Sequence, residues 1–167
     1  IYYWIANEIA LDAKAIKAND NRKNAPEIVI ASRKATPAGF ALLFQEMASL
    51  ANIRCLTVDG YSKFSTEDIG NEPDEFNHTW NVVQLGNSPT EWYYVDVAKA
   101  CGHLDAKGIT FIKSFSSGYF FPDRKLFNLD HLPDNMAWQL GPGPRNLKAF
   151  IDIPVLGPAA YELGLRS

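Results

Sequence analysis

Hydrophobic residues recur at helical spacing at the start of the chain. Ile1, Trp4, Ile5 and Ile9 follow one another at three- and four-residue steps. This spacing predicts an amphipathic helix that runs to about Ala18. The polar stretch 19–24 then breaks the pattern.

Two further helices are predicted before residue 52. Pro26 suits a first helical position, and the helix that it begins is expected to reach about Ala31. Thr36 is a good N-cap and Pro37 a good first residue, because the N–H that proline lacks is unpaired at that position anyway. The helix from Pro37 is expected to end near Asn52, and its apolar residues keep helical steps: Phe40, Leu43, Phe44, Met47 and Leu50.

From Ile53 onward the apolar period changes to two, which is typical of strands. We predict strands over 53–61, 76–85 and 92–97, with a turn at 86–89 between the last two and another turn at 105–108. Helices followed by antiparallel strands predict an α+β domain, with the N-terminal helices packed on the sheet. We expect this domain to span 1–140. Residues 141–167 are expected to be an extension that wraps the domain with one short helix or leads into a further region.

Composition narrows the functional classes. The 167 residues are 47% hydrophobic and 21% charged, enough for one domain with a real core. A net charge of −3 without a Lys/Arg patch argues against nucleic-acid binding, and no apolar run is long enough for a membrane span. The two cysteines make no disulfide framework, and no His or Cys lies at zinc spacing, so we expect neither metal nor cofactor. Because the chain opens without Met in a helical pattern, we expect a fragment of a longer product.

A histidine and an aspartate on two predicted strands form the candidate site. If the strands 76–85 and 92–97 pair as a hairpin, His78 lies across from Asp96 on the same face. An acid on imidazole Nδ1 would stabilise the imidazolium and leave Nε2 for a nucleophile. That nucleophile would come from the start of the helix at Pro37, where the helix dipole lowers a thiol's pKa. A structural role for His78 stays an equal alternative.

Several segments, in order along the chain, resemble the transglutaminase-like superfamily, specifically its kyphoscoliosis-peptidase-like branch. Residues 1–12 resemble its opening helix, and 33–41 (RKATPAGFA) resemble its nucleophile helix, usually R-K-G-x-C-x-G-Y-A. The following strand, the histidine strand and the aspartate strand correspond to 53–61, 78–83 and 92–97. The late signature of the branch corresponds to Tyr119–Asp123 and His131–Leu140.

The resemblance implies a papain-like fold and a Cys-His-Asp triad for amide hydrolysis or transamidation. His78 and Asp96 are retained, but the nucleophile position falls on Pro37. Two neighbourhoods also depart from the family pattern, with Ala35-Thr36 before Pro37 and Ala98-Lys99-Ala100 after Asp96. We therefore expect a vestigial catalytic site in a domain that binds or scaffolds a partner.

The alternative is a working peptidase or transamidase with a substitute nucleophile. Thr36 is better explained as a helix cap, Cys101 fits the helix position poorly, and Ser116 lies in a loop. Cys55 is expected to be a half-buried strand residue. The expected partner is a protein or peptide, or a glycan, held in a groove that draws on aromatic residues, although more of these should be core than groove: Trp80, Trp92, Tyr93, Tyr94, Phe120, Phe121 and Trp138. The compartment stays open, with an extracytoplasmic location as the expectation for a bacterial source.

Overall fold

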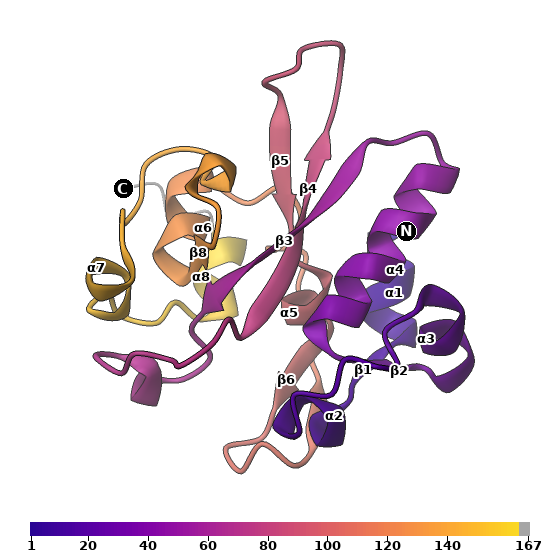
Figure 1. Cartoon of the computed structure of the whole chain (residues 1–167), viewed down its shortest axis with the longest axis horizontal. Coiled ribbons are helices and arrows are strands. Elements are labelled where there is room, and N and C mark those ends of the chain that lie inside the picture. Colours follow the sequence, from indigo (N-terminus) through magenta and orange to yellow (C-terminus); the bar gives the residue numbers. More distant parts are fainter. Residues whose placement is uncertain (164–167) are drawn as a thin grey trace.

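A four-stranded antiparallel sheet in the order β5-β4-β3-β8 forms the centre of the molecule. A computed structural model describes residues 1–163 of the chain. The α+β prediction is confirmed: helices α1, α3 and α4 lie on one side of β3 and β4, and α6, α7 and α8 lie on the other (Figure 1). The strands of this sheet are β3 (Cys55–Ser62), β4 (His78–Gln84), β5 (Trp92–Val95) and β8 (His131–Pro133).

The N-terminal region differs from the single long helix that was expected. Helix α1 ends at Glu8 because Ile9 is extended and Ala10–Leu11 (β1) pair in parallel with Lys34–Ala35 (β2). Asp12 then caps a new helix by accepting from the Ala15 N–H at 3.1 Å. The pairing of distant segments therefore overrides a continuous helical pattern. The helices of this half are α1 (Tyr2–Glu8), α2 (Ala13–Lys17), α3 (Pro26–Ser32) and α4 (Pro37–Leu50).

The second half of the chain is built from short elements. Gly102–Leu104 (β6) and Phe111–Lys113 (β7) form a hairpin around the predicted turn at 105–108. Residues 141–163 carry two short helices, α7 and α8, where one was predicted for 141–167, and the last four residues of that range lie outside the described residues. The remaining elements are η1 (Thr66–Asp68), α5 (Val97–Cys101), α6 (Arg124–Asp130), η2 (Met136–Trp138), α7 (Leu147–Ile151) and α8 (Pro158–Glu162).

Strand β4 is buried on both faces, which explains why its pattern alone does not show a solvent side. On one face, Asn81 donates to the Ala41 carbonyl of α4 at 3.0 Å. On the other, the Trp80 ring packs against Phe127 of α6 and against His131. None of the helices within residues 1–163 has the length and apolar character to cross a membrane. The candidate site lies at the first residue of this doubly covered strand.

Candidate functional site

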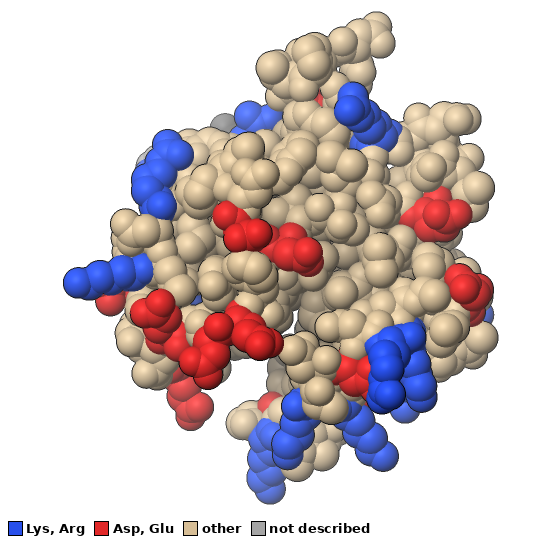
Figure 2. All heavy atoms as spheres, viewed as in Figure 1, with Lys and Arg blue, Asp and Glu red and all other residues tan. Residues whose placement is uncertain are grey.

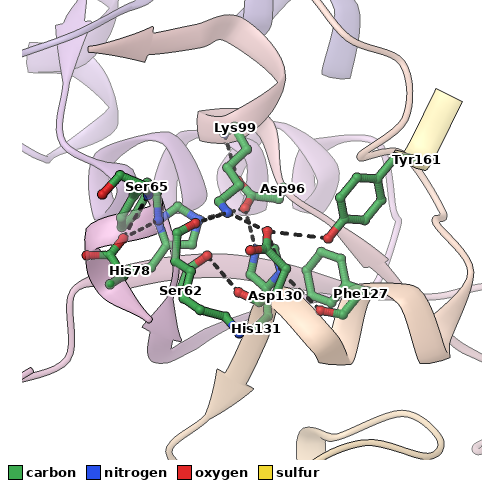
Figure 3. Close-up of polar contacts among 12 residues, drawn as sticks. Ser62, Ser65, His78, Asp96, Lys99, Phe127, Asp130, His131 and Tyr161 are labelled. Carbon is green, nitrogen blue, oxygen red and sulfur yellow. Dashed lines mark hydrogen bonds and ion pairs between the residues drawn. The ribbon is translucent and has the colours of Figure 1, made fainter. Parts of the chain in front are cut away.

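The carboxylate of Asp96 is the centre of a buried polar cluster. Its Oδ2 accepts from Nε2 of His78 at 2.6 Å and from Nε2 of His131 at 2.9 Å (Figure 3). Its Oδ1 accepts from the Lys99 backbone N–H at 3.0 Å, which makes Asp96 the N-cap of α5. The Asp96 side chain has no exposed surface. The predicted His78–Asp96 hydrogen bond is therefore present, with a second histidine on the same oxygen.

The geometry corrects two details of the prediction. Asp96 lies just beyond β5 rather than on it, and the pairing of Asn81 with Val95 shows that His78 is not directly opposite Asp96. The carboxylate also binds Nε2 of His78 rather than Nδ1. The Nδ1 atom of His78 is buried and has no hydrogen-bond partner among residues 1–163. Nδ1 is thus the nitrogen left for a nucleophile.

Burial and the imidazole contacts decide the charge states in the cluster. Burial alone would raise the pKa of Asp96, but the charge of His78 and the N–H donors of both imidazoles outweigh it and hold that pKa well below its usual range. Burial lowers the pKa of His131 to about 4 against the opposing pull of Asp96. At neutral pH the cluster therefore holds an ionised Asp96 beside an uncharged His131.

A second buried carboxylate extends the cluster toward the C-terminal helices. Asp130 Oδ2 lies 2.5 Å from Lys99 Nζ and accepts from the Tyr161 hydroxyl at 3.3 Å (Figure 3). The Lys99 ammonium also donates to the Lys63 carbonyl at 2.8 Å. The cluster thereby connects the residue after β3, α5, the α6–β8 junction and α8.

Sequence reasoning missed these further members. His131 opens the late signature and could have been selected as a second histidine, and Lys99 follows Asp96 by one helical turn. Asp130 and Tyr161 carry no sequence signal of their own, because only the fold brings α6 and α8 to this place.

Two imidazoles and a carboxylate are also a donor set for a transition metal. The three candidate ligand atoms, from His78, Asp96 and His131, lie within 4.8 Å of one another. However, the 2.6 Å between His78 Nε2 and Asp96 Oδ2 is far shorter than the roughly 3.3 Å that separates ligands at zinc bond lengths of ~2.0–2.1 Å. Both Nε2 atoms already donate a proton to Oδ2. The arrangement fits a hydrogen-bonded cluster better than an ion, and the expectation of no metal stays a prediction.

Pro37 is the first residue of α4, as predicted, with Thr36 at the N-cap position. The role expected for the Thr36 side chain is wrong: it caps no helix N–H. Its hydroxyl instead lies 3.0 Å from the side-chain oxygens of both Asn21 and Asn24. The start of α4 is therefore set by Pro37 and by the extended backbone of Thr36. The Thr36 hydroxyl forms hydrogen bonds with the 19–24 loop instead.

The packing of α4 on the sheet gives the level of Pro37 along β4. Gln45 of α4 donates to the carbonyl of Cys55, which is the β3 residue paired with Val83 of β4. One helical turn earlier in α4, the Ala41 carbonyl accepts from Asn81 of β4. A helical turn rises about 5.4 Å, close to the advance of two strand residues. One more turn back brings Pro37 to the level of the first residues of β4. Contact between Pro37 and His78 itself stays a prediction.

The alternative nucleophiles are engaged elsewhere. Cys101 and Cys55 are buried, and burial raises the pKa of each thiol to about 12. The Ser116 hydroxyl lies 2.7 Å from the Glu162 carboxylate. Each of these groups is satisfied or unreactive where it stands, and the Thr36 hydroxyl is taken by two asparagines.

The aromatic residues proposed for a groove are mostly core, as the sequence indicated. Trp80, Trp92 and Tyr94 are buried, whereas Phe120 is 44% exposed. Two hollows in the described part of the chain are lined by other residues, and Tyr61 lines both. A ligand groove that draws on the predicted aromatic residues stays a prediction.

Curated proteins are similar to this chain along its whole length. No protein-family model matches the chain. The kyphoscoliosis peptidases of Mus musculus and Homo sapiens are each 34% identical to it over 168 residues, which cover 100% of this chain and 25% of each relative. The Lim and transglutaminase domain protein ltd-1 of Caenorhabditis elegans is 27% identical over 177 residues, covering 99% of this chain and 24% of that protein. The chain thus spans about a quarter of the length of the curated relatives it matches.

Proposed function

We propose that this chain, which belongs to the transglutaminase-like superfamily in its kyphoscoliosis-peptidase-like branch, is a catalytically inactive domain that binds or scaffolds a partner. The observation that carries the proposal is Pro37 as the first residue of α4, where the family resemblance places the nucleophilic cysteine. His78 and Asp96 remain hydrogen-bonded at the other half of the site.

Proline removes more from this position than a thiol. Covalent acyl transfer needs a nucleophilic side-chain atom, and the proline ring has none. Proline also lacks the backbone N–H that a nucleophile residue contributes to oxyanion binding in papain-like sites. Loss of one oxyanion donor typically costs about 2.7–4 kcal/mol of transition-state stabilisation. The nucleophilic atom and the oxyanion donor are both needed for the attack on the substrate carbonyl. Restoring only one of them would therefore leave this step without the other.

The intact His78–Asp96 pair does not require catalysis to explain it. Asp96 has no access to water, so its charge depends on the donors from His78, His131 and the backbone of Lys99. Removal of one partner from a buried charged pair costs about 3–5 kcal/mol. Because loss of either residue would destabilise the fold, His78 and Asp96 can be retained in a chain that lacks the nucleophile.

The partner that we propose is a protein or peptide, with a glycan as the other class that an aromatic-walled hollow accommodates. The competing function is an acyl-transfer enzyme with a substitute nucleophile. The buried thiols of Cys55 and Cys101 and the engaged hydroxyls of Thr36 and Ser116 weigh against it.

The test is turnover of casein and of a glutamine-containing peptide with an amine acceptor. Wild type and His78→Ala should give the same background, because the first lacks a nucleophile and the second lacks the base as well. Trypsin on casein and a commercial transglutaminase on the glutamine peptide establish that both assays respond. Turnover in the wild type that disappears in His78→Ala would overturn the proposal.

A further inference from the structure

A hollow of about 430 Å³ opens beside the candidate site. Asn19 and Asn21 line it from the loop after α2, and Tyr61 and the segment 74–76 line it from the sheet side. Figure 2 shows acidic side chains on one side of a deep hollow in the surface and Lys and Arg side chains on its other side. Its volume falls within the range of roughly 300–1,000 Å³ that is usual for ligand sites.

The residues that line the hollow are neighbours of both halves of the candidate site. Asn21, on one wall, lies 3.0 Å from the hydroxyl of Thr36, the residue before Pro37. On the other wall, Phe76 precedes His78 by two residues, and Tyr61 follows Gly60, the strand partner of His78. A chain lying in this hollow would therefore contact the loop that bonds to Thr36 and the strand segments next to His78.

The sheet-side wall combines aromatic rings with carboxylates. The Tyr61 and Phe76 rings pack edge to face with centroids 5.0 Å apart, and Phe76 stays 45% exposed. Asp74 and Glu75 stand next to them, and no residue from Phe64 to Ala98 is a lysine or arginine. Glu75 accepts from Asn19 at 3.1 Å across the hollow, whereas Asp74 has no ion pair among residues 1–163. The sheet-side wall thus offers an exposed aromatic ring with two carboxylates beside it, and Lys23 follows the opposite wall at Asn21.

We propose that this hollow binds an arginine side chain of an extended partner peptide. A guanidinium is planar, so it can stack on the exposed Phe76 ring while it donates to the carboxylates of Asp74 and Glu75. A neutral side chain can donate a hydrogen bond to these carboxylates but gains no attraction between opposite charges, and an acidic side chain is repelled. A lysine ammonium stacks less well on a ring. The inference rests on the proposed binding function and names the chemistry of its ligand.

The test is a titration of the ¹⁵N-labelled chain with N-acetyl-arginine-N-methylamide, followed by amide chemical shifts. We expect saturable shifts confined to residues around 19–21, 61 and 74–76. The citrulline analogue, which has the same shape without the charge, should bind at least tenfold more weakly. The lysine analogue should fall between the two. Equal binding of the citrulline analogue, or shifts that lie elsewhere, would overturn the proposal.

Variants of the wall residues separate the contribution of the carboxylates to arginine binding from that of the Phe76 ring. The double variant Asp74→Asn/Glu75→Gln and the single variant Phe76→Ala should each weaken arginine binding at least threefold. Glu46→Gln, which removes a charge from the exposed face of α4, is the matched control and should bind as the wild type does. Unchanged binding in both wall variants would contradict the site. Turnover that depends on His78 would instead overturn the inactive assignment alone, so the two failures are distinguishable.

Discussion

The two halves of the candidate site have opposite characters. The imidazole–carboxylate half is closed to water and held by a network in which Asp96 receives three donors. The other half is the start of α4, where Pro37 is half-buried and Thr36 bonds to Asn21, a loop residue that lines a hollow. Buried charges are costly to remove one at a time, whereas a first helical position accepts proline readily. On the function that we propose, the site has lost its nucleophile while the His78–Asp96 hydrogen bond persists.

The largest expected effect is the loss of Asp96. Asp96→Ala leaves two imidazole N–H groups and the Lys99 N–H without an acceptor, so we expect the free energy of unfolding to fall by about 3–5 kcal/mol. Urea denaturation measures it. Asp96→Asn, which keeps one acceptor oxygen, should lose less, and the exposed Asp74→Asn should change stability by under about 0.5 kcal/mol. A loss in Asp96→Ala as small as that of the control would show that the cluster is not structural.

The second prediction concerns pH. His131 faces Asp96, Asp130, Lys99 and the Phe127 carbonyl, and its pKa is about 4 in the folded chain against the ordinary 6.5. Between these values the unfolded chain binds a proton that the folded chain does not, so stability falls as pH drops from 6.5 to 4. The slope contributed by this group is about 1.4 kcal/mol per pH unit.

Histidine variants isolate that slope. Urea denaturation at a series of pH values measures how the free energy of unfolding depends on pH. Between pH 4 and 6.5, this dependence should be smaller in His131→Gln than in the wild type by the equivalent of about one bound proton. His103→Gln, at an exposed histidine, should keep it. Equal slopes in wild type and His131→Gln would show that another group carries the pH dependence.

The third prediction concerns the distance between the start of α4 and the His78 imidazole. Pro37→Cys should place a thiol near the free Nδ1 of His78, where the helix start and the imidazole lower its pKa. We expect iodoacetamide to label it at pH 7 at least ten times faster than it labels Pro37→Cys/His78→Gln. The wild type gives a low background, because burial raises the pKa values of Cys55 and Cys101 to about 12. An inert thiol, or equal rates in the two variants, would separate Pro37 from His78.

The smallest effect is expected at the helix start itself. Thr36→Val keeps the shape but removes the hydroxyl that bonds to Asn21 and Asn24, so we expect a loss of about 1 kcal/mol. Thr36→Ser should retain most of the stability. Thermal unfolding of the three chains measures this, and a neutral Thr36→Val would show that the loop contact contributes nothing.

Sequence reasoning worked where local pattern and local structure agree. Pro26 and Pro37 begin helices, and the period-two segments become β3, β4 and β5, because these signals act within a few residues. It failed where distant segments meet. The chain 1–18 is not one helix, because β1 pairs with β2 more than twenty residues later.

The order of residues by itself determined the α+β class, the pairing of His78 with Asp96 and the proline at the start of α4. Only the tertiary structure decided which nitrogen of His78 meets the carboxylate, because that depends on how β4 and the start of α5 are set in space. It also placed His131 on the same oxygen and Asp130 beside Lys99, although the α6–β8 junction lies more than thirty residues further along the chain. A buried carboxylate forms hydrogen bonds with the donors that the fold places near it. Local sequence does not show which distant residues become its neighbours.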